Sequence, residues 1–379
     1  MKILLVGEYS RLHNSLKEGL LALGHEVTLV STGDAFKNYP SDILLKRNFN
    51  SGILKKVKIG LFRFFGLDIT SLSLKNQFFA QKEKFKGFDA VQFINESSFG
   101  ILPKYEKEII SYLKKNNKNL FLLSCGTDYT SVKYAFEKKF RYSIFDPLFD
   151  GKVSEKEFYP ALKYLNPEFK DLHNFIVKNV KGVAASDFDY AIPLMGTEKY
   201  FGLIPNPINT KKLQFQPISS KGKIIIFHGI NRENYFKKGN DYFEAALEKI
   251  LQKYPSKVQV ITVENVPYLE YIEKYNSAHI LLDQVFAYDQ GYNALEAMAK
   301  GKVVFTGAET EFLERFNLKE DEVCINTLPD VNYLVEKLES LILNPEKLTA
   351  ISTNARQFIE REHDYVSIAK KYIAFWDAG

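Results

Sequence analysis

The residues from Asp289 to Phe305 combine a glycine, an acidic side chain and small apolar residues at a spacing that can bind a charged ligand. The pattern of this stretch predicts a loop and then a short helix that begins after Gly291. The helix ends at Gly301, and a buried strand follows. A glycine before a helix lets a ligand approach backbone N–H groups that have no partner within the helix. Glu296, in the first turns of that helix, can accept hydrogen bonds from sugar hydroxyls. The pattern therefore suits a nucleotide-sugar, with the diphosphate at the helix N-terminus and the ribose on Glu296.

Packing alone explains the apolar members of this stretch. Leu295, Ala297 and Met298 suit the buried face of a helix, and a glycine at position 301 suits its end. Packing does not explain the entry through a glycine or the glutamate among small apolar residues. These two features favour a binding function.

A cationic loop precedes this stretch in the chain. Residues 229–239 follow a predicted strand and contain Arg232, Lys237 and Lys238. Arginine offers a planar fork for phosphate oxygens, and lysine offers a point charge. At the carboxyl end of a strand, such cations would neutralise a pyrophosphate leaving group. The alternative is an exposed cationic loop without a ligand, but the order of the two blocks favours a function.

The two blocks resemble the donor-site signature of GT-B glycosyltransferases, especially the retaining family 4 (glycosyl transferases group 1) of the bacterial surface-glycan type. That signature is a glutamate, a Gly-aromatic-Gly turn and Leu-Glu-Ala-Met-Ala-x-Gly-x-Pro-Val. Residues 295–301 and Val304 match it. Two positions depart from it: Tyr288 replaces the first glutamate, with Asp289 as the nearest acid, and Val303 replaces a frequent proline.

The resemblance implies a role for each matching residue. Arg232 and Lys238 would bind the donor diphosphate, with Lys237 as the rival of Lys238, and Glu296 would bind the ribose. Asn265 or Tyr268 would contact the nucleotide base. Asp283 would face the donor, unless it only caps a helix. The other donor contacts that we expect are Gly229, Asn231, Tyr288, Asp289, Gly291, Tyr292, Asn293 and Ala294.

Polar loops after predicted strands of the front half form the candidate acceptor site, because ligands of parallel sheets bind at the carboxyl ends of strands. The first loop has one glycine and lacks a Gly-x-Gly-x-x-Gly fingerprint, which argues against a dinucleotide dehydrogenase. For His13, in the first loop, a structural role is the alternative. Asp128 lies in a loop that resembles the family's Gly-Thr/Ser-Asp turn, and helix capping is the alternative for this residue. The candidates are Tyr9, Ser10, Arg11, His13, Asn95, Glu96 and Asp128.

Strands alternate with helices along both halves of the chain, which predicts an α/β fold with parallel sheets. Prolines at 205 and 207 break this pattern. We predict an N-terminal acceptor-binding Rossmann-like domain at residues 1–205, a linker at 206–221, and a nucleotide-sugar-binding Rossmann-like domain at 222–362. The resemblance implies that the GT-B sheets face a central cleft and that the C-terminal helix, residues 363–379, packs back on the first domain.

Length and composition restrict the class of protein. A chain of 379 residues is too long for one core and fits two domains. Two distant cysteines and six scattered histidines suggest neither a disulfide framework nor a metal site. We find no signal peptide, no apolar run of the roughly 18 residues that span a bilayer, and no zinc or RNA-binding signature. We therefore expect a cytoplasmic protein without metal, other cofactor or nucleic-acid partner.

Positive charge is concentrated in the front half. Residues 1–220 contain 32 Lys and Arg against 22 Asp and Glu, whereas the remainder contains 19 against 24. This asymmetry indicates an anionic partner such as a membrane surface, a lipid pyrophosphate or an acidic glycan; solvated lysines are the alternative. Residues 54–65 mix cations with large apolar residues, which fits an interfacial helix and equally a core helix with a lysine face.

These patterns predict a retaining, metal-independent glycosyltransferase of the hexosyltransferase type. It would move a sugar from a nucleotide-diphosphate donor to a glycan or lipid-linked glycan in bacterial surface polysaccharide synthesis, in the cytoplasm or peripherally at the inner face of the membrane. Two alternatives stay open: a nucleotide-sugar 2-epimerase of GT-B fold, and a non-catalytic nucleotide-sugar- or glycan-binding protein, which Tyr288 favours.

Overall fold

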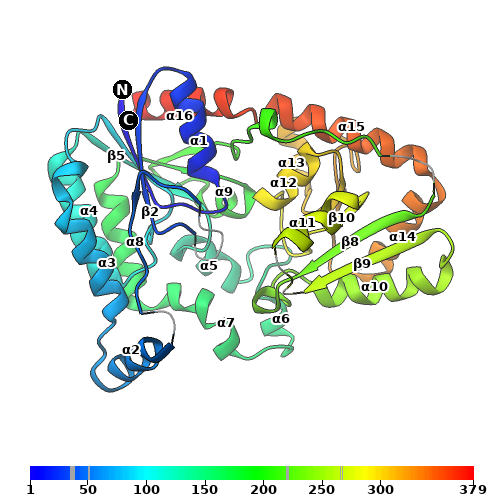
Figure 1. Cartoon of the computed structure of the whole chain (residues 1–379), viewed down its shortest axis with the longest axis horizontal. Helices are drawn as coiled ribbons and strands as arrows, with labels where there is room; N and C mark the ends of the chain where they lie inside the picture. The colour runs from blue at the N-terminus through cyan, green and yellow to red at the C-terminus, as the bar shows by residue number, and fades with distance from the viewer. Residues whose placement is uncertain (35–38, 50–51, 219–221, 265, 267) are drawn as a thin grey trace. The chain divides into compact units, whose positions relative to one another are not determined.

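The computed structural model describes residues 1–34, 39–49, 52–218, 222–264, 266 and 268–379. The chain divides into two compact units, each with a parallel β-sheet (Figure 1). The first unit contains Met1–Lys133, Pro160–Pro207 and Tyr365–Gly379. The second contains Tyr134–Tyr159 and Ile208–Asp364.

The first unit is built on a seven-stranded sheet in the order β3-β2-β1-β4-β5-β6-β7. All neighbouring strands are parallel, so their carboxyl ends share one edge. The strand order reverses between β1 and β4, where open parallel sheets bind their ligands. The strands are β1 (Lys2–Val6), β2 (Glu26–Ser31), β3 (Ile43–Leu44), β4 (Ala90–Phe93), β5 (Asn119–Ser124), β6 (Gly182–Ala185) and β7 (Tyr200–Leu203).

Helices connect these strands and cover the sheet. They are α1 (Leu12–Ala22), α2 (Gly52–Phe65), α3 (Ile69–Ala80), α4 (Pro103–Asn116), α8 (Pro167–Asn179) and α9 (Phe188–Leu194). The last helix of the chain, α16 (Tyr365–Ala378), belongs to this unit and packs on α1. A Cβ on Gly19 of α1 would lie 2.2 Å from the Tyr365 carbonyl oxygen, so glycine permits this close approach.

The second unit has a five-stranded sheet in the order β12-β11-β10-β8-β9, again with parallel neighbours. Its strands are β8 (Ile224–Ile230), β9 (Val258–Glu264), β10 (Ile280–Leu282), β11 (Val303–Thr306) and β12 (Ile325–Asn326). Its helices are α10 (Asn240–Lys253), α11 (Tyr268–Ser277), α12 (Tyr292–Ala299), α13 (Thr310–Phe316), α14 (Val331–Leu343) and α15 (Pro345–Glu362).

Residues 134–159 belong to the second unit although they lie between β5 and β6 in the chain. They include the end of α5 (Tyr129–Phe136), all of α6 (Asp146–Phe149) and the start of α7 (Glu155–Leu162). The predicted first domain, residues 1–205, includes this segment. Its membership in the second unit follows from contacts that no local pattern encodes.

The predicted α/β fold class with two parallel sheets is confirmed. Strands alternate with helices along both halves of the chain, as predicted. In the part of the chain that is described, the helices all lack the combination of length and apolar character that crossing a membrane requires.

Candidate functional site

The candidate donor residues lie at the carboxyl edge of the second sheet. Strand β8 pairs with β9 on one side and with β10 on the other, so the strand order reverses between β8 and β10. The loop that contains Arg232 follows β8, Glu264 ends β9, and Asp283 follows β10. Parallel sheets bind ligands at such a reversal, and the predicted donor loops meet there.

Lys238 and Asn293 converge on the carboxylate of Asp283. The Lys238 ammonium lies 3.0 Å from Oδ1 of Asp283, and the Asn293 amide donates to the same oxygen at 3.0 Å. Asp283 is buried, whereas the Lys238 side chain is 33% exposed. The aspartate therefore orients a solvent-accessible cation beside the first turn of α12. It anchors this cluster rather than caps a helix.

Lys237 has a different environment from its neighbour. Its ammonium lies 5.1 Å from the centre of the Phe158 ring, within the segment 134–159. Burial lowers the pKa of Lys237. Of the two rival lysines, only Lys238 contacts the side chains that follow β10 and open α12 among the described residues.

Arg232 forms an exposed, bidentate pair with Glu264. Nε and Nη2 of Arg232 each donate to a carboxylate oxygen at 2.7 Å, and the guanidinium lies over the Tyr235 ring. The hydrogen bond to Glu264 raises the pKa of Arg232. Because exposed ion pairs are weak, a phosphate can replace Glu264 as the partner of this guanidinium. Nearby, Asn231 caps the 3₁₀ turn by accepting from the Glu233 N–H.

Helix α12 begins at Tyr292 with Gly291 as its N-cap, and in the described structure it has no side-chain cap. Its first N–H groups carry a partial positive charge and suit an anion. Tyr292 and Ala294 are buried and Asn293 is exposed. Glu296 is partly exposed. The predicted helix that opens after Gly291 is therefore present, and its role in anion binding stays a prediction.

Tyr288, at the position of the first signature glutamate, is covered by the segment 134–159. It is 2% exposed, and its hydroxyl accepts a hydrogen bond of 2.7 Å from the Arg141 backbone N–H. The rings of Phe140 and Tyr142 pack on it, and the Arg141 guanidinium lies 4.6 Å from its ring centre. Tyr288 therefore supports a loop. Its neighbour Asp289 is also buried.

Two glutamates bind side chains of the loop that covers Tyr288. The Arg141 guanidinium binds Glu309 and Glu311 at 2.7 Å, and the Tyr142 hydroxyl donates to Glu309. Glu309 also accepts from the Asn326 amide at 3.0 Å. None of these side chains was a candidate in the sequence, because their partners are distant in the chain.

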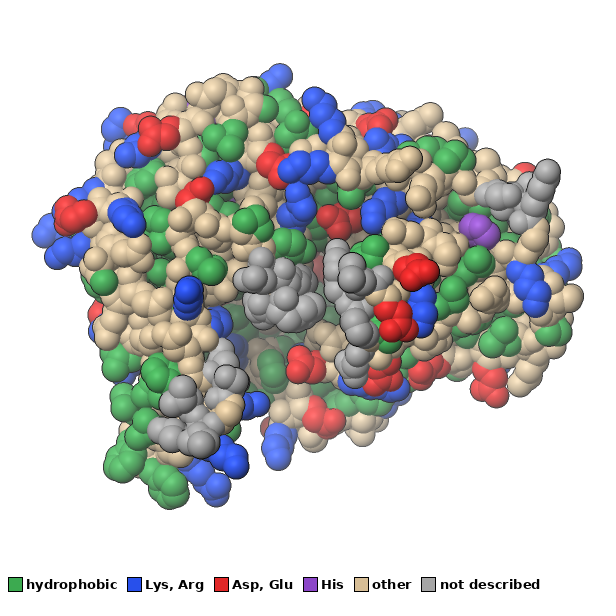
Figure 2. Space-filling model, in the orientation of Figure 1, with side chains coloured by type: hydrophobic (Ala, Val, Ile, Leu, Met, Phe, Trp, Pro, Cys, Tyr) green, Lys and Arg blue, Asp and Glu red, His purple; other side chains and the backbone are tan. Residues whose placement is uncertain are grey.

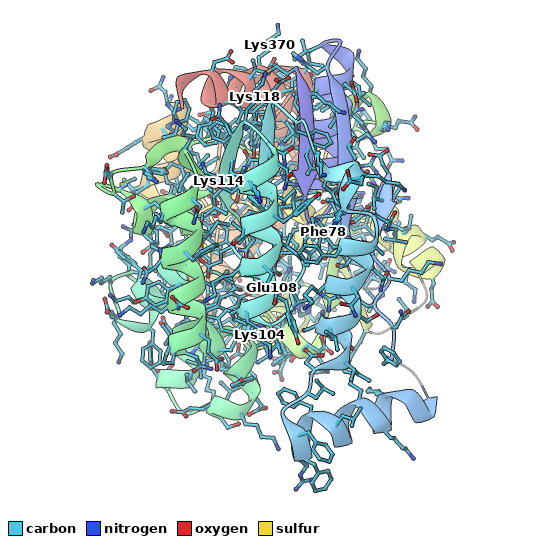
Figure 3. The ribbon with its side chains drawn as sticks, turned by 90° about the vertical axis from the view of Figure 1, so that its left-hand side faces the viewer. Phe78, Lys104, Glu108, Lys114, Lys118 and Lys370 are labelled. Atoms are coloured by element: carbon cyan, nitrogen blue, oxygen red, sulfur yellow. The ribbon has the colours of Figure 1, made fainter. Side chains whose placement is uncertain are left out.

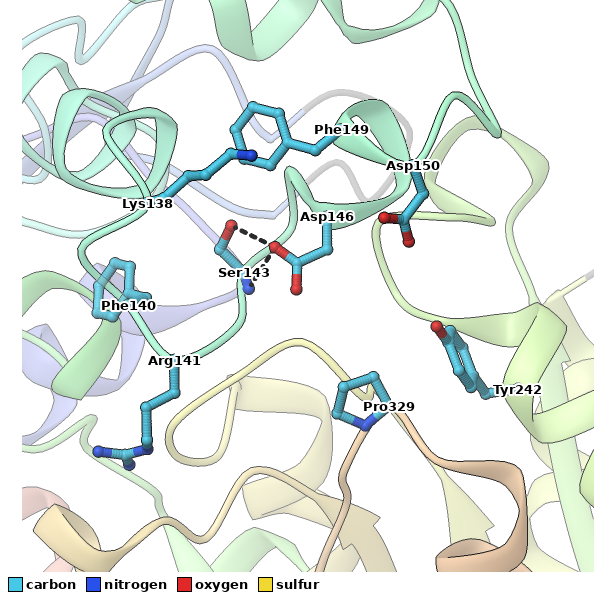
Figure 4. Close-up of a pocket in the computed structure, with 9 residues that line it drawn as sticks. All are labelled: Lys138, Phe140, Arg141, Ser143, Asp146, Phe149, Asp150, Tyr242 and Pro329. Atoms are coloured by element: carbon cyan, nitrogen blue, oxygen red, sulfur yellow. Dashed lines mark hydrogen bonds between the residues drawn. The ribbon is translucent and has the colours of Figure 1, made fainter.

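The same segment lines a cavity of about 440 Å³ in the second unit (Figure 4). Seven of its nine lining residues lie between Lys138 and Asp150, and the others are Tyr242 and Pro329. Asp146 accepts from the backbone N–H and the hydroxyl of Ser143, as the dashed lines show. The lining mixes carboxylates, cations and aromatic rings, and no sequence motif predicted it.

Two candidate base contacts cannot be placed. Asn265 lies outside the described residues, and so does the side chain of Tyr268. Gly229 lies within β8 and is partly buried. The prediction for the base-binding loop therefore stays a prediction.

The acceptor candidates lie at the carboxyl edge of the first sheet, where Gly7 follows β1. A Cβ on Gly7 would lie 2.5 Å from Cγ2 of Ile94 and 2.8 Å from the Ser98 carbonyl oxygen, and its φ is +87°. Glu8 is buried beside it and accepts from the backbone and side-chain amides of Asn14 at 2.8 and 2.6 Å. Burial raises the pKa of Glu8 to about 7. Glu8 was not among the predicted acceptor residues, although its place directly after a strand could have indicated it.

Glu96 pairs with a histidine that the sequence analysis missed. Its carboxylate lies 2.8 Å from Nδ1 of His173 and accepts from the Tyr129 N–H at 2.9 Å. Burial raises the pKa of Glu96 to about 6, and the hydrogen bond to this carboxylate raises the pKa of His173 against the effect of its burial. Asn95 is buried and donates to the carbonyl oxygens of Cys125 and Thr127. Glu96 and Asn95 thus connect the loops after β4 and β5.

The other acceptor candidates have structural partners. Asp128 accepts from the Ser131 N–H at 2.7 Å, which is a helix-capping contact at the start of α5. His13 is fully buried, and its Nδ1 lies 2.8 Å from the Gly7 carbonyl oxygen; burial lowers its pKa to about 4. Tyr9 donates to the Ser97 carbonyl oxygen, Ser10 to Asp34, and Arg11 to Glu18. Ser10 and Arg11 have positive φ angles of 50° and 74°.

Comparison with known protein families finds a match to part of the chain. Residues 231–374 match the family model described as glycosyl transferase-like, which covers less than half of the sequence. Comparison of the sequence with curated proteins gives no match.

Solved structures share the fold at low sequence identity. Sucrose-phosphate synthase from Thermosynechococcus elongatus is 16% identical, with a TM-score of 0.62 over 100% of both chains. HepE from Anabaena, in complex with UDP and glucose, is 12% identical, with a TM-score of 0.59 over 100% of both chains. WaaG, a glycosyltransferase involved in lipopolysaccharide biosynthesis, is 14% identical, with a TM-score of 0.55 over 100% of both chains. The predicted GT-B fold is confirmed, and the chain contains a glycosyl transferase-like domain over residues 231–374.

Proposed function

We propose that this protein transfers a sugar from a nucleotide-diphosphate donor, bound by the second unit, to an acceptor bound by the first. The observation that carries the proposal is the cluster of Lys238, Asp283 and Asn293 at the N-terminus of α12. It places a cation beside the start of α12, where the first N–H groups have no carbonyl partner within the helix; both features suit a diphosphate. HepE, of the same fold, was solved with UDP and glucose, which supports this class of donor.

Positive charge from the protein would stabilise the departing diphosphate. Lys238 and Arg232 would contact phosphate oxygens as negative charge develops in the transition state, an electrostatic role that requires no proton transfer by the protein. Glu296 would bind the ribose. Because side chains and a helix end supply the charge, we propose a metal-independent reaction that retains the anomeric configuration, with the leaving phosphate taking the acceptor proton.

We propose a glycan or lipid-linked glycan of a bacterial surface polysaccharide as the acceptor. The buried carboxylates of Glu8 and Glu96 lie in the loops after β1 and β4, and carboxylates accept hydrogen bonds from sugar hydroxyls. WaaG, of the same fold, is involved in lipopolysaccharide biosynthesis, which supports this class of acceptor.

Ligand-induced stabilisation tests the donor site. We would measure the melting temperature with UDP, GDP, dTDP, ADP and CMP, and with their common sugar conjugates, in the presence and absence of EDTA. One nucleotide should raise the melting temperature, with or without EDTA, because a ligand that binds the folded state stabilises it. Lys238→Ala should remove the shift, whereas Lys237→Ala, a matched control, should retain it because that ammonium lies over Phe158. No shift with any nucleotide, or equal loss in both variants, would contradict the proposed site.

A turnover assay separates transfer from the two alternatives. Release of nucleotide diphosphate that increases when an acceptor glycan is added supports transfer. Release without any acceptor, together with a 2-epimerised sugar, identifies an epimerase. Binding without turnover, in the wild type and in Tyr288→Glu alike, identifies a binding protein. The burial of Tyr288 under Arg141 is the observation that keeps the last alternative open.

A further inference from the structure

Helix α2 (Gly52–Phe65) lies at the margin of the first unit and packs on α3 (Figures 1 and 3). Gly66 follows it in a left-handed conformation, with φ of +63°, and donates its N–H to the Phe62 carbonyl oxygen. This turn ends the helix immediately after two phenylalanines. The possibility of a core helix with a lysine face is not what the structure shows.

Large apolar side chains of this helix are exposed to solvent. Phe64 is 78% exposed and Phe65 is 77% exposed, and Ile59 and Phe62 are exposed as well, together with Leu67 just after the helix. These five account for a large share of the exposed large hydrophobics among the described residues, and the others are scattered along the chain. Figure 2 shows hydrophobic and cationic side chains gathered at this place. A concentrated apolar surface of this kind marks an interaction site.

The charge of α2 has one sign. The helix contains Lys55, Lys56, Lys58 and Arg63 and no aspartate or glutamate. At 100° per residue, Leu61, Phe64 and Phe65 fall on one side together with Lys58. Lys55, Lys56 and Arg63 fall on the other side together with Ile59, and Phe62 lies between the two sides. Long cationic side chains can direct their charged ends to a polar layer while the apolar face is buried.

A bilayer surface with anionic lipids satisfies both faces at once. Phenylalanines enter the boundary between headgroups and acyl chains, and lysines remain among lipid phosphates. A helix of 14 residues is about 21 Å long, too short to cross a bilayer but sufficient to lie in its interface.

We propose that α2 is a membrane-docking helix that binds anionic phospholipid surfaces, with Phe64 and Phe65 inserted and Lys55, Lys56 and Arg63 at the headgroups. This proposal goes beyond glycosyl transfer and does not depend on it, since α2 contains none of the candidate donor or acceptor residues.

Vesicle co-sedimentation tests the proposal on the full chain. We would compare vesicles of phosphatidylcholine alone with vesicles containing 30% phosphatidylglycerol, a fraction chosen on the order of natural anionic membranes. The wild type should bind the anionic vesicles preferentially and lose most binding in high salt. Phe64→Ser/Phe65→Ser should weaken binding about tenfold or more, and Lys55→Glu/Lys56→Glu should abolish the preference for anionic lipid.

Matched controls identify what each substitution removes. Met195→Ser changes another exposed apolar side chain, 57% exposed, of the same unit. Lys114→Glu/Lys115→Glu makes the same charge reversal on α4. Both control variants should retain at least half of the wild-type binding, and circular dichroism should show that all variants are folded.

Three results would overturn the proposal. The wild type could fail to bind anionic vesicles, or the Phe64→Ser/Phe65→Ser variant could bind as well as the wild type. Alternatively, light scattering could show a wild-type dimer that this variant dissociates, in which case a second copy covers α2. The nucleotide-dependent melting shift should be the same in this variant, so failure of the membrane proposal and failure of the donor site are distinguishable.

Discussion

Tyr288 shows how one substitution in a signature changes the role of a residue. The expected glutamate would offer a carboxylate to a ligand, whereas the tyrosine hydroxyl accepts a hydrogen bond from the Arg141 backbone and its ring supports Phe140 and Tyr142. The side chain thus stabilises the loop that covers it.

Tyr288→Phe should destabilise the protein by about 1–2 kcal/mol, because a buried hydrogen bond to the Arg141 N–H is lost while the ring packing remains. Urea unfolding measures this change. Tyr142→Phe is a useful comparison, because its hydroxyl donates to the carboxylate of Glu309 and its loss should cost at least as much. If Tyr288→Phe leaves the free energy of unfolding unchanged, water replaces the hydroxyl as the partner of the Arg141 N–H.

Glu106 predicts a pH dependence of stability. It is buried, its Oε1 accepts from the N–H groups of Phe99 and Ile101 at 3.0 and 3.4 Å, and burial raises its pKa from 4.5 to about 7. A raised carboxyl pKa means that the folded state binds the proton more tightly. Its contribution to stability is therefore complete below about pH 4.5 and is lost as the pH rises through 7.

Glu106→Gln imitates the protonated carboxyl group, since the amide oxygen can accept the same hydrogen bonds. The variant should match the wild type near pH 5 and exceed its stability by up to about 3 kcal/mol at pH 8.5. Urea unfolding at several pH values measures the difference. Glu108→Gln makes the same substitution on the exposed side of α4 and controls for the loss of a carboxylate from this helix. A difference between Glu106→Gln and the wild type that does not vary with pH would contradict the assignment.

At the scale of elements, the docking of α16 on α1 depends on the absence of a side chain at position 19. A Cβ there would lie 2.2 Å from the Tyr365 carbonyl oxygen and 2.9 Å from the Ala369 Cβ. The Tyr365 carbonyl oxygen belongs to the backbone of α16, so it cannot move away from an added Cβ as the end of a flexible side chain could. Gly60, in the middle of α2, has no atom within 4 Å of its Cβ position among the described residues.

These two helical glycines should respond to alanine in opposite directions. Gly60→Ala should stabilise the protein by roughly 0.5–1 kcal/mol, because alanine loses less backbone entropy in a helix. Gly19→Ala should destabilise it by about 1–3 kcal/mol, because overpacking outweighs that gain. Thermal and urea unfolding measure the stability of the two variants relative to the wild type. Stabilisation by Gly19→Ala would show that α16 does not hold this position in solution.

The whole molecule offers a probe that separates its two units. The single tryptophan, Trp376, belongs to the first unit, where it is buried and its indole N–H donates to Gln92 at 2.9 Å. A nucleotide that binds the second unit stabilises that unit directly. Chains with two units often depart from two-state unfolding.

The nucleotide should therefore shift the transition seen by far-ultraviolet circular dichroism more than the one seen by Trp376 fluorescence. Both can be recorded in the same urea series, with Lys238→Ala as the control that binds no nucleotide. Equal shifts in both signals would show that the two units unfold as one cooperative block.

Local patterns were sufficient for the elements and for the helix that opens the candidate donor site. Periodicity and Gly291 predicted α12 and its uncapped start, because a helix and its N-terminus depend on residues only a few positions apart. Most strands of the two sheets were predicted for the same reason, but the short edge strands β3, β7 and β12 were not. Which loops would meet at each sheet edge followed from the parallel topology.

Tertiary structure decided the features that depend on distant residues. It separated Lys238 from Lys237, because the partner Asp283 lies 45 positions away. It covered Tyr288 with Arg141 across 147 positions and paired Glu96 with His173 across 77. It also exposed the phenylalanines of α2, whose sequence fitted a core helix equally well. Contacts over such separations are set by the packing of whole elements, and neither the spacing nor the chemistry of neighbouring residues encodes them.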